Sequence, residues 1–364
     1  MKSPWRFVVA PLLALAVLAA AGCANLGYYW QSAGGHLKVM NAARPVQEWI
    51  DDPATPPKLK ERLLLARRIR AWAASELHLP ANASYTRYAD LHRSAVVWNV
   101  VAAPALSLEL KTWCFPVLGC VGYRGYFDEA EARHEAEALA AEGWESSWYP
   151  VPAYSTLGWM NWAGGDPLLS TFINYPEGEL ARLVFHELAH QEVYAAGDTM
   201  FSESFAVAVE RLGGERWLAT QAGEAARNEY AAYDGRRRQF RALTRATRER
   251  LQQIYEAKVP GSGADTARAA MKNVAMQEFR AQYARLRDSW GGDPARFRAT
   301  NEWVARANNA SFGAQAAYDE LVPGFEALFH RNGGDWRRFY DATRALAKLP
   351  KDERRKQLKE LAGA

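Results

Sequence analysis

The sequence is poor in cysteine and carries little net charge. It holds three cysteines in 364 residues, and its formal net charge is +4 without any long basic block. A charge this small excludes the strongly basic surface typical of nucleic-acid binding, so no nucleic-acid partner is expected. No internal repeat is evident. The hydrophobic fraction of 49% and charged fraction of 24% are ordinary for a soluble globular protein, and the length allows one core with a helical appendage.

The first residues lack an apolar run long enough to span a membrane. Lys2 and Arg6 give a positive start, and the apolar run over residues 7–21 is shorter than the roughly 20 residues of a spanning helix. The run ends in small residues directly before Cys23. This pattern predicts a signal peptide over residues 1–22.

The end of this run resembles the bacterial lipobox, after which a signal peptidase cuts and the next residue, Cys23, carries lipid. The alternative is a plain secretory signal in which Cys23 is incidental. Ala24 follows, in place of the aspartate that often retains lipoproteins at the inner membrane. The resemblance therefore implies a membrane anchor on the periplasmic face of the outer membrane.

Export changes the interpretation of the other two cysteines. Cys114 and Cys120 are separated by a segment with a proline and a glycine that can turn the chain. In an oxidising periplasm this spacing predicts a short disulfide loop. Two free buried cysteines are the alternative, and a metal site is disfavoured because no further soft ligand lies nearby.

Residues 58–214 mix short β-prone runs with helices and predict a core with a small sheet. Residues 23–57, with several glycines and prolines, predict a lead from the anchor to this core with some helix in it. The predicted strands cover residues 96–101, 106–110, 123–127 and 154–158, and the predicted helices cover residues 58–77 and 128–142.

Residues 215–364 are predicted to be helical. Two long helices, over residues 215–255 and 264–290, are joined by a Gly/Pro loop and predict an antiparallel hairpin. A helical stretch over residues 301–329 is expected to be interrupted at Pro323, and the last 30 residues to form one charged helix. The predicted fold class is α+β and mostly helical.

The segment His186-Glu187-Leu188-Ala189-His190 carries the clearest chemical pattern. Residues 177–196 predict a helix, because they lack proline and carry an apolar stripe. Residues four apart on a helix share a face, so His186 and His190 can bind one Zn²⁺ at about 2.0–2.1 Å each. Glu187 lies beside them and can act as general base on a metal-bound water.

A catalytic zinc site needs a third protein ligand, which the next segment can supply. A second helix is expected after the turn at residues 197–199, and Glu203 at its beginning can complete a His₂Glu site. Glu210 lies on the same face and suits a supporting role, accepting the free N–H of a ligating histidine. By its spacing from His190, Glu210 also suits the third ligand itself. Asp198 either supports the site or serves as a turn and cap residue.

A resemblance favours Glu203. Residues 201–206 resemble the Asn-Glu-x-Phe-Ala segment that supplies the glutamate ligand in gluzincins of the aminopeptidase-N type, where a glutamate seven residues on supports the site, as Glu210 would here. Ser202 stands where those enzymes have Asn, and the connector between the helices is shorter. The Gly-x-Met-Glu-Asn motif that anchors a substrate amino group in them is absent.

A nearer resemblance relates the chain from about residue 40 onward to a family of bacterial zinc aminopeptidases, often lipoproteins. It implies a gluzincin-like zinc peptidase, with a zincin-like core over residues 58–214 and a cleft completed by residues 215–364. The matching segments are residues 113–117, 123–127, 153–158, the HELAHQ helix, and residues 197–199, 203–206 and 308–310.

Peptide hydrolysis also needs a hydrogen-bond donor for the oxyanion. Tyr154 is one candidate, because a strand over residues 154–158 would precede the metal helix, where a zincin places the strand that pairs with substrate. Tyr318, downstream of the metal site, is the other. Either tyrosine can instead be a packed aromatic. The remaining histidines lack ligand-spaced partners and are not expected to be catalytic: His36, His78, His92, His134 and His330.

The sequence therefore predicts a lipid-anchored zinc peptidase, and the family resemblance implies that it is an aminopeptidase. His186, His190 and Glu203 would hold Zn²⁺, and Glu187 would be the general base. One alternative is a catalytically degenerate zincin with a binding or scaffold role in the envelope. Glu187 argues against it, since a structural site needs no base. The other alternative is an exported helical lipoprotein in which the motif is accidental.

Overall fold

The computed structural model describes residues 27–115 and 119–363. The described chain is mostly helical with small sheets, so the predicted α+β class is confirmed. The predicted signal peptide over residues 1–22 and the predicted lipidation site Cys23 lie outside the described residues. Within the described ranges, no helix combines the length and the apolar character that crossing a bilayer requires.

The central sheet is antiparallel, with β3 between β6 and β7. All of β3 is buried, because α4 packs on one face of the sheet and α10 on the other. Side chains alternate along a strand, so Trp98 and Val100 pack toward α4 while Val101 packs toward α10. These elements are β3 (Val97–Ala103), β6 (Arg124–Tyr126), β7 (Glu145–Val151), α4 (Glu129–Ala141) and α10 (Asn309–Asp319).

Two smaller sheets connect distant parts of the chain. In one, β2 pairs antiparallel with β1 and parallel with β8. In the other, β4 and β5 form a hairpin in which Cys114 and Cys120 are joined by a disulfide. These strands are β1 (Arg44–Pro45), β2 (Arg87–Ala89), β8 (Leu168–Leu169), β4 (Trp113–Phe115) and β5 (Gly119–Val121).

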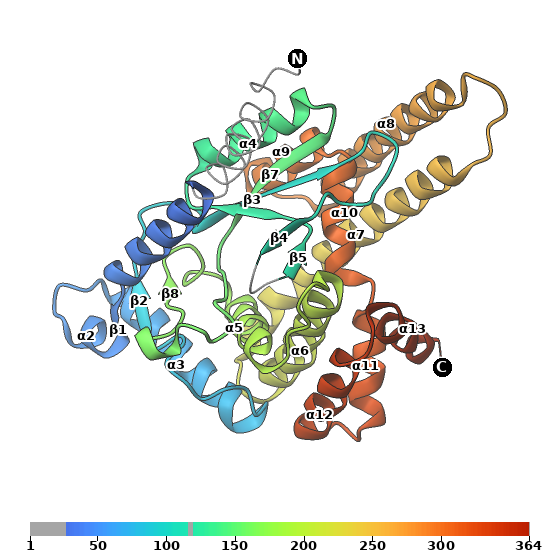
Figure 1. The fold of residues 1–364 in the computed structure, drawn as a ribbon. Coiled ribbons are helices and arrows are strands. Elements are labelled where there is room, and N and C mark those ends of the chain that lie inside the picture. The colour runs from blue at the N-terminus through green and yellow to red at the C-terminus, as the bar shows by residue number, and fades with distance from the viewer. Residues whose placement is uncertain (1–26, 116–118, 364) are drawn as a thin grey trace, which may run out of the picture.

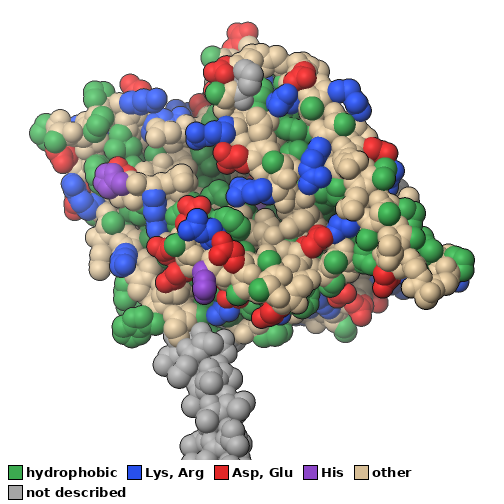
Figure 2. All heavy atoms as spheres, turned by 90° about the horizontal axis from the view of Figure 1, so that it is seen from above, with side chains coloured by type: hydrophobic (Ala, Val, Ile, Leu, Met, Phe, Trp, Pro, Cys, Tyr) green, Lys and Arg blue, Asp and Glu red, His purple; other side chains and the backbone are tan. Residues whose placement is uncertain are grey.

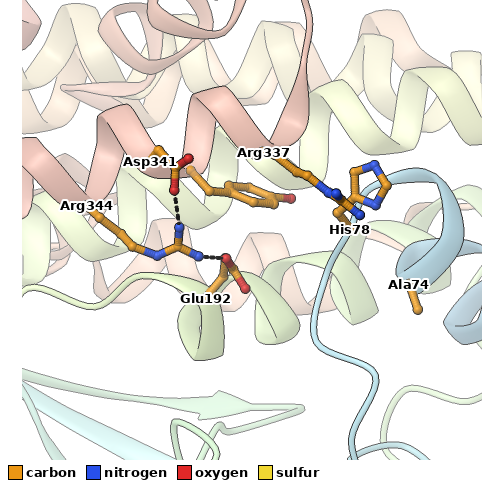
Figure 3. A pocket seen from close by; sticks show the side chains of 7 residues that line it. Ala74, His78, Glu192, Arg337, Asp341 and Arg344 are labelled. Carbon is orange, nitrogen blue, oxygen red and sulfur yellow. Dashed lines mark hydrogen bonds and ion pairs between the residues drawn. The ribbon is translucent and has the colours of Figure 1, made fainter.

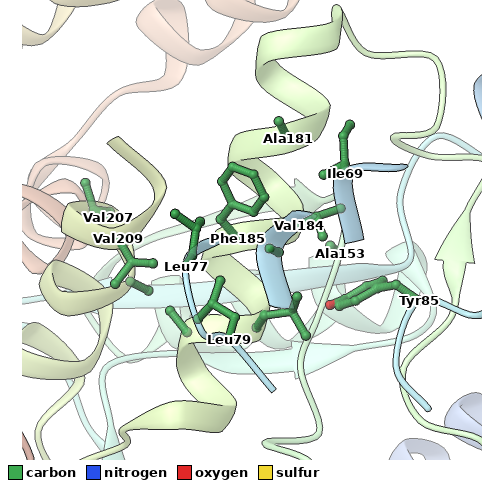
Figure 4. Packing of buried hydrophobic residues seen from close by; sticks show 14 of the residues in the cluster. Ile69, Leu77, Leu79, Tyr85, Ala153, Ala181, Val184, Phe185, Val207 and Val209 are labelled. Carbon is green, nitrogen blue, oxygen red and sulfur yellow. The ribbon is translucent and has the colours of Figure 1, made fainter. Parts of the chain in front are cut away.

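The main core surrounds α5 (Glu177–Glu192), which packs along α6 (Thr199–Thr220) and against α3 (Pro57–Glu76). Figure 4 shows Val184 and Phe185 of α5 among side chains from these neighbouring elements. Two glycines of α6 let the helices approach closely. A Cβ atom on Gly213 would lie 3.1 Å from a ring carbon of Phe185, and one on Gly214 would lie 2.6 Å from Cγ of Arg182.

The second half of the described chain is helical, as predicted. The long helices α7 and α8 lie side by side as the expected hairpin and extend from one side of the body (Figure 1). The elements of this half are α7 (Glu224–Glu256), α8 (Ala264–Trp290), α9 (Arg298–Arg306), α11 (Val322–Arg331), α12 (Trp336–Ala347) and α13 (Lys351–Ala362), with a short 3₁₀ helix at Pro294–Phe297. The first half also contains α2 (Val46–Asp51) and a short 3₁₀ helix at Asn161–Ala163.

Two predicted strands are wrong. Residues 154–158 form a turn-rich segment, because Leu157 and Gly158 have φ of 54° and 78°, which a strand does not allow. Residues 106–110 are irregular, and the amide of Glu109 donates to the Ser107 hydroxyl instead of to a neighbouring strand.

Several helix boundaries also differ from the predicted ones. The helix that carries His186 and His190 ends at Glu192, where Val193 takes an extended conformation, and the break before α7 falls at residues 221–223. Pro323 lies in the first turn of α11, a position that needs no backbone N–H, so it helps to start that helix. The last 30 residues contain two helices, separated near Pro350.

Candidate metal centre

Helices α5 and α6 bring three metal-ligating side chains together. His186 and His190 project from one face of α5, and their Nε2 atoms lie 3.2 Å apart. Glu203 lies near the beginning of α6, and its Oε2 is 3.3 Å from His186 Nε2 and 3.6 Å from His190 Nε2. His190 and Glu203 are buried, and His186 is half-buried.

The spacing of the three atoms fits one tetrahedral ion. Two ligand atoms at about 2.0–2.1 Å from a Zn²⁺, at tetrahedral angles, lie about 3.3–3.4 Å apart. The observed separations of 3.2, 3.3 and 3.6 Å are close to that value. Two imidazoles and one carboxylate also match the ligand set of zinc sites that keep an open fourth position. The group is therefore compatible with a bound metal ion.

Glu210 lies on the other side of the His186 ring. Its Oε2 accepts a hydrogen bond from His186 Nδ1 at 3.1 Å, while its Oε1 pairs with the guanidinium of Arg182. Glu203 thus lies beside the Nε2 atoms of both histidines, whereas Glu210 contacts the Nδ1 side of the His186 ring. Arg182 itself is 3% exposed and also donates to the Tyr230 hydroxyl at 2.7 Å, so α7 supports the site from behind.

The electrostatics keep both glutamates ionised. Burial alone would raise the pKa of Glu203, but His190 and His186 outweigh it and hold that pKa at about 2. For Glu210, Arg182 and His186 likewise outweigh burial and hold the pKa at about 2. Burial raises the pKa of Glu187, and the neighbouring histidines partly oppose the increase. A carboxylate with a raised pKa is suited to take up a proton near neutral pH.

Asp198 lies at the beginning of α6 and acts as a cap. Its carboxylate accepts from the Phe201 amide at 3.3 Å and pairs with Arg355 of α13, whose Nε lies 3.1 Å away. Of the two roles considered for Asp198, these contacts correspond to the cap. They hold the helix that carries Glu203 and do not involve the histidines.

A cavity of about 310 Å³ opens beside the three ligands. Glu187, Tyr154 and Tyr318 all line it. Burial raises the pKa of both tyrosines, so their hydroxyls stay protonated and can donate. The charge on Glu203 adds to the rise in the pKa of Tyr318, and the charge on Asp166 adds to the rise in the pKa of Tyr154.

Sequence reasoning missed several residues of this cavity. His36, on a helix over residues 27–42, lines it and lies with Nδ1 2.7 Å from the Tyr154 hydroxyl. Tyr123 and Tyr194 line it as well. No local pattern marks His36, because its partner is 118 residues away. Arg182 did carry a signal, since it lies four residues before His186 on the same helical face.

A second cavity, of about 430 Å³, lies where the end of α5 meets α12 (Figure 3). Its charged side chains are largely engaged with one another. Arg344 pairs with Glu192 and donates to Asp341 at 2.7 Å. Since Glu192 closely follows His190, these pairs hold the end of the ligand-bearing helix. Over the face seen in Figure 2, positive and negative side chains are interspersed.

In a comparison with known protein families, a family model described as "Putative aminopeptidase" matches residues 27–358. No curated protein and no solved structure matches the chain.

Proposed function

Because the chain belongs to this aminopeptidase family, as its resemblance predicted, we propose that it is a zinc-dependent aminopeptidase with a zincin-like core. The observation that carries the proposal is the convergence of His186, His190 and Glu203 at one wall of a cavity that Glu187 also lines. A structural metal site needs neither an adjoining cavity nor a further carboxylate that lines it.

The roles of the residues follow from their positions. His186, His190 and Glu203 would hold Zn²⁺, which when bound lowers the pKa of a water molecule and polarises the scissile carbonyl. Glu187 takes the proton from the attacking water and passes it to the leaving amine. Tyr318 and Tyr154 keep their protons and can donate to the oxyanion that develops on the substrate. Glu210 keeps His186 oriented.

The test combines metal analysis with a peptide digest. Purified protein should contain close to one zinc per chain, and a mixed-peptide digest read by mass spectrometry should show residues removed one at a time from the amino end. Glu187→Gln should keep the zinc and lower the rate by about 10²–10⁴-fold. Zinc without Glu187-dependent hydrolysis would indicate a binding role instead, and internal cleavage would indicate an endopeptidase.

A further inference from the structure

Two segments that adjoin the cavity expose tryptophan and carry almost no charge. Among the described residues, the largely exposed tryptophans are Trp30, Trp159 and Trp162, at 81%, 66% and 83%. Residues 27–42 contain one Lys, Arg, Asp or Glu, namely Lys38, and residues 152–165 contain none. The charged fraction of the whole chain is 24%, so this depletion is marked.

The two segments lie beside each other. His36 of the first is hydrogen-bonded to Tyr154 of the second, with 2.7 Å between Nδ1 and the hydroxyl. Arg87 joins them again near their ends, because its guanidinium donates to the Met40 carbonyl at 3.3 Å and lies against Gly164, where an added Cβ would be 2.9 Å from Nη1. Figure 1 shows the blue helix over residues 27–42 next to the green segment that follows β7.

In both segments the exposed apolar side chains are carried by a hydrogen-bonded backbone. On the helix over residues 27–42, Tyr28, Ser32 and His36 line the cavity at a spacing of four. Trp30 and Leu37, seven residues apart, share another face and are exposed. In the second segment the amide of Ala163 donates to the Met160 carbonyl at 2.9 Å, and the amide of Gly165 donates to the same oxygen at 3.0 Å. These bonds give the loop that carries Trp159 and Trp162 a defined shape.

We infer that these exposed residues form a surface that docks on a phospholipid bilayer. We call it the tryptophan surface, and its residues are Tyr29, Trp30, Leu37, Trp159 and Trp162. Tryptophan and tyrosine favour the boundary between lipid and water, where one part of the ring is buried and the polar N–H or O–H stays hydrated.

The lipid anchor predicted at Cys23 is the reason for proposing a bilayer as the partner of the tryptophan surface. Cys23 lies seven residues before Trp30, and even a fully extended chain of that length spans only about 25 Å. A lipid on Cys23 would therefore hold the helix over residues 27–42 close to the membrane. His36 and Leu157 line the cavity, so docking would place the two segments that carry them between the cavity and the lipid.

The test uses the full-length, lipidated protein in phosphatidylcholine vesicles with brominated acyl chains, which quench nearby tryptophan fluorescence. A triple variant, W30F/W159F/W162F, removes the exposed tryptophans. We expect the quenched fluorescence to fall at least about twofold in this variant. The quenched fluorescence of the wild type should barely change with salt, because Lys38 is the one charged side chain of the two segments. A matched variant, W49F/W144F/W290F, removes three half-buried tryptophans and should leave the quenched amount unchanged.

Two results would overturn the inference. One is equal quenching in the wild type and in W30F/W159F/W162F, or no quenching in either. The other is a concentration-dependent blue shift without vesicles that the triple variant abolishes, since this would show that a second copy of the chain covers the surface. Circular dichroism of each variant establishes that the fold is retained.

Discussion

The two walls of the cavity beside His186 and Glu203 are encoded differently along the chain. The wall proposed to bind the metal, called the metal-binding wall, comes from residues 186–203, on two consecutive helices. The opposite wall combines the helix over residues 27–42, strands β3, β6 and β7, and Tyr318 of α10. Helical periodicity places the first set of side chains, whereas only tertiary packing brings the second set together. The chemistry of a site can therefore be local in sequence while the shape of its pocket is not.

The largest effect is expected from breaking the metal-binding wall. Glu203→Ala removes the carboxylate that lies beside both Nε2 atoms. We expect it to lose zinc on dialysis and to lower peptidase activity more than about 10³-fold, because both the water activation and the carbonyl polarisation depend on the ion. Metal content by mass spectrometry and initial rates on a peptide measure the two losses.

A matched control lies on the same ligand-bearing helix. Glu192→Ala also removes a glutamate near His190, but Glu192 pairs with Arg344 outside the cavity. It should retain zinc and most of the activity. If both variants lose zinc equally, the loss reflects damage to α5 and the assignment of Glu203 as a ligand would be unsupported.

The second prediction separates the two tyrosines. Charges on Glu203 and Glu187 add to the rise in the pKa of Tyr318. For Tyr154 the charge on Asp166 does so, and its hydroxyl is hydrogen-bonded to His36. Tyr318→Phe should therefore lower kcat about 10–100-fold, as expected for the loss of one oxyanion donor. Tyr154→Phe should act mainly on KM. Steady-state kinetics of both variants decide the matter, and a larger fall of kcat in Tyr154→Phe would reverse the assignment.

The convergence of His186, His190 and Glu203 could be predicted because each step depended on helix geometry. Spacing placed His186 and His190 on one face, and Glu203 and Glu210 on one face of the next helix. Spacing alone left the two glutamates interchangeable, and only a resemblance favoured Glu203. In the structure the His186 ring lies between them, with Nε2 toward Glu203 and Nδ1 toward Glu210. That orientation depends on the buried Arg182, which a helical pattern could have indicated.

The opposite wall could not be predicted from local patterns. The segment after β7 has a composition typical of a strand, yet the left-handed backbone conformations of Leu157 and Gly158 make it a loop. Residues 23–57 read as a lead to the core, but the helix over residues 27–42 contributes His36 to the cavity. Contacts across more than 100 residues decide these features, and periodicity carries no information about them.

The third prediction concerns the support behind His186. Glu210→Gln should weaken zinc binding about 10–100-fold, because it loses the charged acceptor of the His186 N–H. It should also change how the metal-free protein responds to acid. Arg182 and His186 outweigh burial and hold the pKa of Glu210 at about 2, below its usual 4.5. The carboxylate thus stabilises the fold above about pH 4.5, and this contribution is lost as the pH falls toward about 2.

Urea unfolding between about pH 6 and pH 3 measures that contribution. The free energy of unfolding should fall with acid by about 1–3 kcal/mol less in Glu210→Gln than in the wild type. Glu48→Gln, at an exposed position, should follow the wild type. Parallel curves for Glu210→Gln and the wild type would show that Glu210 is not ionised in its contact with Arg182.

The smallest effect is expected from the residue that local patterns did not mark. His36→Ala removes the partner of the Tyr154 hydroxyl but touches neither the predicted ligands nor the base. The Tyr154 ring remains packed edge-to-face against Phe127, with centroids 5.7 Å apart, so the side chain keeps part of its orientation. We therefore expect KM to rise about two- to tenfold, corresponding to one neutral hydrogen bond, with zinc content unchanged.

His92→Ala, at a histidine whose side chain is 86% exposed, is the matched control. Because His36 acts through Tyr154, His36→Ala should have no effect in a Tyr154→Phe background, and additive losses in the double variant would show that the two residues work independently.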